Sequence, residues 1–263
     1  MDMNHKEDRF DFGKNWSNYL SLINSERISR AEESLVEMFE LKEFKNKSFL
    51  DIGCGSGIFS LAARNLGATV LSFDYDPKSV ECARSLKKKY CQHDGRWEIE
   101  SGSMLDKYYI ERLGKHDLVY CWGVAHHTGD MFQALENLTE TVKTKGQVLV
   151  AIYNSQGSLT KYWTFIKRWF VRYPIIRPIL IAMHAFMILF PSMLLKKLRG
   201  QKIPRGMSAW YDLLDWLGGY PFETSTASGI FEFFKKRGFR LEKLKTVGGK
   251  MGCNEFVFRK IEE

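Results

Sequence analysis

Acidic residues are absent from one long stretch of this sequence. None lies between residues 141 and 211, whereas twelve lysines and arginines do. The whole chain has 39 Lys and Arg against 31 Asp and Glu, and outside this stretch only 27 basic residues face all 31 acidic ones. The net charge of +8 therefore belongs to one region, which favours an anionic partner such as a membrane surface or a nucleic acid.

The sequence also lacks paired cysteines, a leader-peptide pattern and a membrane-spanning run. Its five cysteines show no C-x-x-C spacing, so we expect neither a disulfide framework nor a metal site. The first residues are charged rather than apolar, which predicts a cytoplasmic protein. The apolar stretch 179–190 is interrupted by His184 and is shorter than the roughly 20 residues that a spanning helix needs.

The most informative stretch is 48–63, which reads SFLDIGCGSGIFSLAA. Phe49, Leu50 and Ile52 form the apolar run expected of a central parallel strand, which is covered on both faces. Glycines then follow at alternate positions, where they allow unusual backbone angles and let a ligand approach the main chain. The residues from Ile58 onward predict a helix whose first N–H groups face that ligand.

The spacing of these glycines indicates the kind of cofactor. G-x-G-x-G after Asp51 differs from the G-x-G-x-x-G that binds a dinucleotide pyrophosphate. A second predicted strand, 69–74, ends in Asp74, roughly 20 residues after the glycines, where a carboxylate can accept both hydroxyls of a ribose. An acid at Asp51 suits a ligand with an ammonium group better than one with phosphates. Together these features resemble motif I and the acidic loop of class I S-adenosylmethionine (SAM)-dependent methyltransferases.

The resemblance covers 48–154 and 224–259, and it is nearest to the ubiquinone-biosynthesis O-methyltransferases and related small-molecule methyltransferases. It implies SAM as the cofactor. It also implies an α/β fold: a Rossmann-like sheet, mostly parallel, with a C-terminal antiparallel hairpin and an inserted helical segment after the fifth strand. The cofactor-binding residues that it implies are Asp51, Gly53, Cys54, Gly55, Asp74, Tyr75, Ser103, Met104, Trp122 and Trp16. Ser103 stands where the family usually has an acid or a small polar residue against adenine, and Asp106 comes slightly late for that contact.

A loop with two histidines follows the fourth predicted strand. Residues 122–128 read WGVAHHT and resemble the W-G-V-L-H-H-T stretch of small-molecule methyltransferases. Ligands of open α/β sheets bind outside the carboxyl ends of the strands, so this loop should meet the methyl acceptor. His127 and His126 are candidates for a catalytic base, because imidazole titrates near neutral pH. The alternative is that one of them orders the loop or touches the cofactor. The candidate substrate-binding residues are Tyr153, Asn154, Tyr220 and Glu223.

Four segments are expected along the chain. Residues 1–47 form an N-terminal helical cap, and 48–154 form the SAM-binding core. Residues 155–223 form a basic, hydrophobic helical insert, and 224–263 add the helix and hairpin that complete the sheet.

The insert interleaves cations with aromatic residues. Its expected lipid-facing cations are Lys161, Lys167, Arg168 and Arg172, and Tyr162, Ile166, Trp169 and Tyr173 share one helical face. Basic, aromatic-rich helices with a short apolar core are typical of the bilayer interface, so we expect 155–205 to contact an anionic membrane. The alternative is a hydrophobic lid on the domain, with its charges solvated.

The sequence thus predicts a methyltransferase that acts on a hydroxyl of a small-molecule, quinone, or lipid- or glycan-linked acceptor, in the cytoplasm at the inner membrane face. Two other functions remain open. One is an RNA methyltransferase that binds phosphates through the insert, against which stands the long apolar core of that segment. The other is a SAM-fold protein without catalytic activity that serves as a membrane-associated partner, against which stand Asp51, the glycines and Asp74.

Overall fold

A computed structural model describes residues 20, 23–92, 94–189 and 209–261 of the 263-residue chain. The described residues form two compact units. The sheet unit contains those of 11–156 and 223–263, and the helical unit contains those of 157–222. Most of the expected insert therefore belongs to the helical unit.

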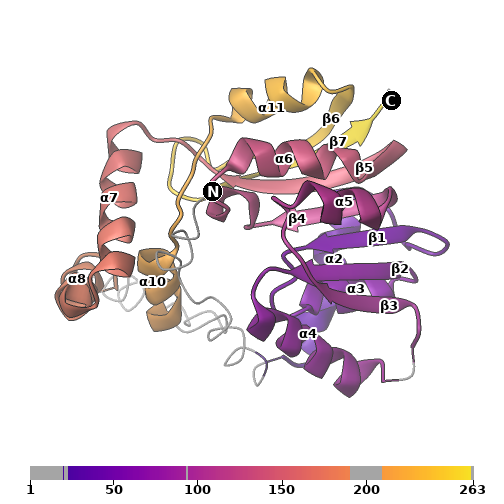
Figure 1. Ribbon diagram of the computed structural model, residues 1–263, viewed down its shortest axis with the longest axis horizontal. Coiled ribbons are helices and arrows are strands. Elements are labelled where there is room, and N and C mark those ends of the chain that lie inside the picture. The colour runs from indigo at the N-terminus through magenta and orange to yellow at the C-terminus, as the bar shows by residue number, and fades with distance from the viewer. Residues whose placement is uncertain (1–19, 21–22, 93, 190–208, 262–263) are drawn as a thin grey trace, which may run out of the picture. The chain divides into compact units, whose positions relative to one another are not determined.

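The sheet unit is built on seven strands in the order β3-β2-β1-β4-β5-β7-β6 (Figure 1). β1 (Ser48–Ile52) lies at the centre of the parallel part, between β2 (Thr69–Asp74) and β4 (His116–Trp122). The parallel part continues with β3 (Trp97–Ser101) on one side and β5 (Val142–Tyr153) on the other. β7 (Cys253–Lys260) and β6 (Phe239–Lys245) add an antiparallel edge. The predicted fold class, including the helical segment after the fifth strand, is confirmed.

Helices cover both faces of this sheet (Figure 1). One face carries α2 (Ser25–Phe39), α3 (Ile58–Asn65) and α4 (Pro77–Tyr90), and the other carries α5 (Lys107–Leu113), α6 (Met131–Glu140) and α11 (Ala227–Lys235). Each layer has its own apolar core, since Phe49 of β1 packs toward the first and Val150 of β5 toward the second. α5 was not expected from the sequence, because about two turns of helix are too short to show a period.

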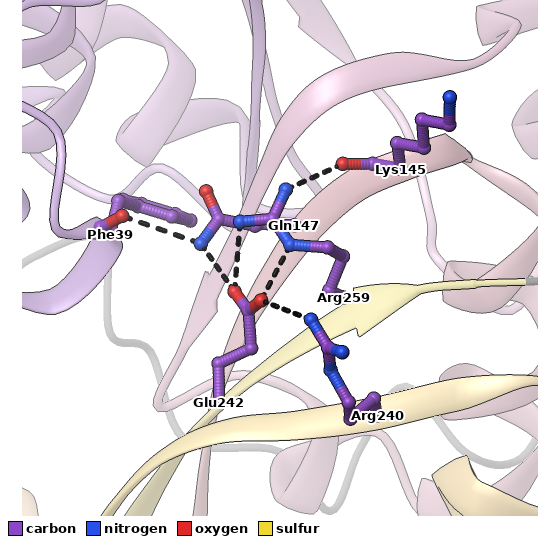
Figure 2. Close-up of polar contacts among 6 residues, drawn as sticks. All are labelled: Phe39, Lys145, Gln147, Arg240, Glu242 and Arg259. Atoms are coloured by element: carbon purple, nitrogen blue, oxygen red, sulfur yellow. Dashed lines mark hydrogen bonds and ion pairs between the residues drawn. The ribbon is translucent and has the colours of Figure 1, made fainter.

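A carboxylate on β6, Glu242, contacts β5 and β7 near the starts of the parallel strands, where Gln147 of β5 pairs with Leu118 of β4. Figure 2 shows its polar contacts. Glu242 accepts hydrogen bonds from the Arg259 guanidinium on β7 and, at 2.8 Å, from Nε2 of Gln147 on β5. Gln147 also donates to the carbonyl oxygen of Phe39 at the end of α2. Although burial alone would raise the pKa of Glu242, the hydrogen bonds from Arg259 and Gln147 hold it below its usual value. Charge-assisted bonds to Glu242 thus join β5 and β7 to β6, and a neutral hydrogen bond from Gln147 joins β5 to α2.

The helical unit consists of α7 (Ser158–Arg172), η3 (Pro174–Ile176), α8 (Arg177–His184), η4 (Ala185–Leu189) and α10 (Ala209–Gly218). Its interior includes Trp163 and Phe170 of α7 and Leu217 of α10. His184 is also buried, with Nδ1 2.7 Å from the Leu180 carbonyl oxygen and Nε2 3.1 Å from the Tyr162 hydroxyl. Within the described ranges, no helix taken singly has the length and apolar character of a membrane span. Ser158–Arg172 and Pro174–Met187 meet that test of length and composition only as a pair, bent by 111°.

Candidate cofactor and acceptor site

The turn after β1 folds over the carboxyl end of β2. The N–H groups of Gly53 and Cys54 both donate to the carbonyl oxygen of Phe73, at 2.8 and 3.0 Å. Gly53 and Gly55 have φ values of +69° and +52°, which L side chains rarely adopt. The sequence therefore needs glycine here to bend the chain directly at the end of the strand.

Asp74 closes one side of this turn. Its Oδ2 accepts a hydrogen bond from the Gly55 N–H, and its Oδ1 accepts one from the Asp76 N–H, each at 2.9 Å. Burial raises the pKa of Asp74 to about 6, against the lowering effect of these two bonds. The next side chain, Tyr75, is 50% exposed. The carboxylate proposed for the ribose thus lies against the glycine turn, and the half-exposed Tyr75 follows it in the chain.

Asp51 lies inside the sheet unit, with 2% of its surface exposed. Its Oδ2 accepts a hydrogen bond from the Ser60 hydroxyl of α3, and Ser60 Oγ lies 2.8 Å from Ser72 Oγ of β2. The indole N–H of Trp97 donates to Ser72 Oγ at 2.7 Å. Burial raises the pKa of Asp51 to about 7, the Ser60 bond opposes the rise, and the nearby Asp74 charge adds to it. Ser60 and Ser72 were not singled out from the sequence, although a hydroxyl in an otherwise apolar strand or helix is a usable signal.

The loop after β3 lies at the carboxyl end of β2, beside Asp74. The Gly102 N–H donates to the carbonyl oxygen of Asp74 at 3.0 Å, which brings Ser103 and the buried Met104 beside the end of β2. Ser103 Oγ accepts from the Leu105 N–H at 3.2 Å. Asp106 caps α5 by accepting from the Tyr109 N–H at 3.1 Å. Asp106 comes later in the sequence than the residue expected against adenine because it is the N-cap residue of α5.

The histidine loop packs directly on the glycine turn. A Cβ atom added to Gly53 would lie 2.4 Å from Cγ2 of Val124, so the valine side chain occupies that space. Val124 is followed by η2 (Ala125–His127), which holds both histidines. The residues expected to bind a cofactor and those expected to meet an acceptor are thus in contact.

His126 and His127 differ in exposure. The ring of His126 is 0% exposed and lies 4.1 Å from the ring of Tyr153, measured between centroids. His127 is partly exposed, 4.5 Å from the His126 ring and 5.6 Å from the Tyr153 ring. Tyr153, at the end of β5, therefore joins the two histidines in one aromatic cluster.

Glu223 anchors this loop through its backbone and its carboxylate. Its N–H donates to the carbonyl oxygen of His126 at 3.0 Å. Its carboxylate oxygens accept from the N–H groups of Gly129, at 3.0 Å, and Met131, at 3.1 Å, at the start of α6. Burial raises the pKa of Glu223 against the effect of these bonds. The carboxylate of this candidate substrate-binding residue is thus hydrogen-bonded to backbone N–H groups of its own protein.

The remaining candidates are placed as follows. Asn154 forms a β-bridge with Ser225, and its side-chain oxygen accepts from Asn254 at 3.1 Å. Trp122 donates across β5 to Glu255 of β7 at 2.9 Å. Tyr220 belongs to the helical unit, and Trp16 lies outside the described residues. In the part of the chain that the structure describes, no group of three His, Cys, Asp or Glu side chains is arranged to hold a metal ion.

Known proteins share much of this architecture. Residues 23–182, more than half of the chain, match the family model described as methyltransferase domain. A mitochondrial ubiquinone biosynthesis O-methyltransferase from Schizosaccharomyces pombe is 32% identical over 136 residues, which are 51% of this chain and 47% of that protein. A ribosomal protein L11 methyltransferase from Thermosipho africanus is 32% identical over 122 residues, 46% of this chain and 43% of that protein. The chain spans about half the length of the curated relatives it matches.

A solved structure extends the similarity to nearly the whole chain. Magnesium protoporphyrin IX methyltransferase from Synechocystis PCC 6803, crystallised with bound SAH, superimposes with a TM-score of 0.57 at 14% identity. The match covers 95% of each chain. At this identity it establishes a shared fold.

Proposed function

The chain belongs to the class I SAM-dependent methyltransferases, and from this membership we propose that it transfers the methyl group of SAM to a hydroxyl of a small-molecule, quinone, or lipid- or glycan-linked acceptor. The observation that carries the proposal is the packing of Val124 on Gly53. A cofactor on the glycine turn and an acceptor on the histidine loop would therefore be neighbours. Relatives named ubiquinone biosynthesis O-methyltransferases support oxygen as the accepting atom.

The side chains around the turn fit SAM. Asp74 has two carboxylate oxygens at the end of β2, where they can accept the ribose hydroxyls, and desolvation makes such charge-assisted bonds strong. Tyr75, next to Asp74 in the chain and half exposed, would cover one face of an adenine ring, and the buried Met104 lies in the loop after β3 beside the end of β2. Asp51 remains the candidate for the ammonium group of SAM, and its buried carboxyl also accepts a hydrogen bond from Ser60 of α3.

SAM supplies a methyl carbon that its sulfonium makes electrophilic. As the acceptor oxygen forms its bond to that carbon and the carbon–sulfur bond breaks, the hydroxyl proton must leave. We assign this proton to an imidazole nitrogen of His127, because His127 is partly exposed whereas His126 is fully buried. The loop contributes by aligning the acceptor, and alignment is worth roughly 7–11 kcal/mol at its upper limit.

We place this activity in the cytoplasm at the inner membrane face, with peripheral contact through 155–205. The support is the charge pattern, since the twelve cations between residues 141 and 211 have no acid among them. A lipid-linked acceptor would be confined to that same surface.

Isotopic labelling tests the proposed function. The protein is incubated with cell extract and SAM carrying a labelled methyl group, and the products are separated into lipid-soluble molecules, water-soluble small molecules, RNA and protein. We expect an ether-linked label in a lipid-soluble or small molecule, identified by mass spectrometry. Label confined to RNA or protein would contradict the proposal and, for RNA, support the alternative use of the basic insert.

A further inference from the structure

The first helix of the helical unit carries two aromatic faces. Trp163, Ile166 and Phe170 form the buried face of α7. A neighbouring, exposed face carries Tyr162, Phe165, Trp169 and Tyr173. The Phe165 and Trp169 rings lie 4.8 Å apart, and those of Trp169 and Tyr173 lie 5.4 Å apart. The helical period of the sequence placed Ile166 on one face with Tyr162, Trp169 and Tyr173, but Ile166 is buried and Phe165 is exposed beside them instead.

The exposed apolar surface continues beyond the bend after α7. Ile175 of η3 is 87% exposed and Ile179 of α8 is 68% exposed. Met183 and Met187 are also exposed in the following turns. Single exposed apolar residues are normal, but a series of them along consecutive helices is typical of an interaction site. We call the exposed residues of α7 and η3–α8 the α7–α8 surface.

Cations border this surface, and they are fewer than the sequence suggested. Lys161, Arg168 and Arg172 are exposed on α7. Lys167 is fully buried, donates to the Trp216 carbonyl oxygen, and lies 4.0 Å from the centre of the Trp216 ring. Its expected role as a lipid-facing cation is therefore wrong, and it belongs to the interior of the helical unit.

Arg177 is also used inside the helical unit. It donates to the carbonyl oxygens of Phe170 and Val171, at 2.8 and 2.9 Å, and so satisfies the end of α7. Among the described residues of α7 and α8, the exposed cations are therefore Lys161, Arg168 and Arg172, on a stretch of chain without acids.

We propose that the α7–α8 surface binds the face of an anionic lipid bilayer. Aromatic rings such as Trp169 and Tyr173 are suited to the headgroup boundary, where one side is apolar and the other is wet. Ile175 and Ile179 would reach the acyl boundary, while the three exposed cations attract anionic headgroups. Nucleic-acid phosphates would account for the cations but not for the exposed isoleucines. The inference rests on the proposed function and deepens it by locating the membrane contact on named residues of α7, η3 and α8, and it does not depend on which hydroxyl is methylated.

Flotation of the full chain with vesicles tests the docking surface. The vesicles are made of phosphatidylcholine, with or without phosphatidylserine. Wild type should float with the anionic vesicles and, as salt rises, lose part of this binding. The Lys161→Glu, Arg168→Glu, Arg172→Glu variant should weaken partitioning on the order of a hundredfold. Its control reverses three exposed lysines of the sheet unit, Lys42, Lys88 and Lys236, and should float as wild type does.

A second pair of variants tests the apolar part. Ile175→Ser with Ile179→Ser should lower partitioning at every salt concentration, because the loss is not electrostatic. Tyr108 of α5 is 86% exposed, and Tyr108→Ser is the control that should have no effect. Lys167→Met is not a test of docking, since Lys167 lies in the interior. Circular dichroism shows whether each variant keeps its helices.

The outcomes separate the docking surface from the catalytic proposal, because SAM affinity is measured on the same samples by titration. Wild type that fails to float, or charge-reversed protein that floats as well as wild type, would overturn the docking surface while leaving SAM binding untouched. If the wild-type protein retards an RNA oligonucleotide in a gel but does not float with vesicles, the partner of the α7–α8 surface is RNA and not a lipid bilayer. Wild type that floats but does not bind SAM would overturn the proposed function alone.

Discussion

The side chain of Val124 fills the space that a β-carbon on Gly53 would need, since an ideal Cβ atom there would lie 2.4 Å from Val124 Cγ2. Gly53 also has a φ of +69°, so two independent constraints select glycine at this position. The contact joins the turn after β1 to the loop after β4, and these are the two loops at the topological switch point of the sheet. A change at Gly53 should therefore affect both the fold and cofactor binding.

Gly53→Ala tests this contact. The variant should weaken SAM binding and lower the free energy of unfolding, with about 1–2 kcal/mol from the left-handed backbone and a further roughly 1–3 kcal/mol from overlap with Val124. Gly248→Ala is the control, because Gly248, in the turn between β6 and β7, has a φ of +56° but no atom within 4 Å of an added Cβ. Denaturant unfolding and calorimetric titration with SAM give the two readouts. Equal destabilisation by both substitutions would show that Val124 moves aside.

Asp74→Ala tests the ribose contact. Loss of a charge-assisted acceptor is worth about 1.5–3 kcal/mol, so SAM affinity should fall at least tenfold. Glu242→Ala also removes a carboxylate with charge-assisted hydrogen bonds, at the other end of the sheet, and should lower stability without changing SAM affinity. If the two variants bind SAM equally well, Asp74 does not hold the cofactor.

The pKa of Asp51, about 7, predicts an unusual dependence of stability on pH. The ordinary pKa of this side chain is 3.8, so between about pH 4 and 7 the folded chain keeps a proton that the unfolded chain has lost. The contribution of Asp51 to the free energy of unfolding therefore falls as pH rises through this window, and it levels off above about pH 7. Asp74, with a pKa of about 6, acts in the same direction.

Asp51→Asn should accordingly gain stability relative to wild type as pH rises from about 5 to 8, measured by denaturant unfolding without SAM. Asp117→Asn is the control. Although burial alone would raise the pKa of Asp117, hydrogen bonds from Ser48 and Lys143 hold it at about 2, below the tested range. Its loss should lower stability by the same amount at each pH. A stability difference between Asp51→Asn and wild type that stays constant with pH would contradict the raised pKa.

His127→Gln should reduce turnover roughly a hundredfold or more if His127 removes the acceptor proton, because glutamine keeps hydrogen bonding but cannot take up a proton at neutral pH. SAM affinity should stay unchanged. His126→Gln should instead lower the melting temperature, because the buried His126 ring packs 4.1 Å from Tyr153. Transfer of labelled methyl groups into the acceptor fraction measures turnover. Full turnover by His127→Gln would exclude it as the base.

Glu223→Ala distinguishes support of the loop from substrate binding. The carboxylate accepts from two N–H groups at the start of α6, so its removal should cost about 1–2 kcal/mol of stability, as for other helix caps. SAM affinity should change little. Thermal and denaturant unfolding provide the measurement, and unchanged stability with lost turnover would show that Glu223 contacts the acceptor instead.

The order and type of the main strands were predictable because their signals are local. The apolar run of β1, the alternate glycines and the acid ending β2 each depend on residues close together in sequence, whose backbone preferences and periodicity are set within a few positions. The same holds for the hairpin of β6 and β7, where alternation marks the two strands. The sequence by itself therefore determined where the main strands lie along the chain, and the resemblance of its glycine motif to class I methyltransferases gave the fold class and the expected cofactor.

Tertiary packing decided which of two similar side chains is buried and which is exposed. Lys161 and Lys167 lie on the same helix and look alike in sequence, but only the position of α10 makes Lys167 a buried partner of the Trp216 ring. His126 and His127 are adjacent, yet the course of β5 buries the first beside Tyr153 and leaves the second accessible. Burial depends on elements far away along the chain, and local periodicity carries no information about which face of a helix or loop those distant elements will cover.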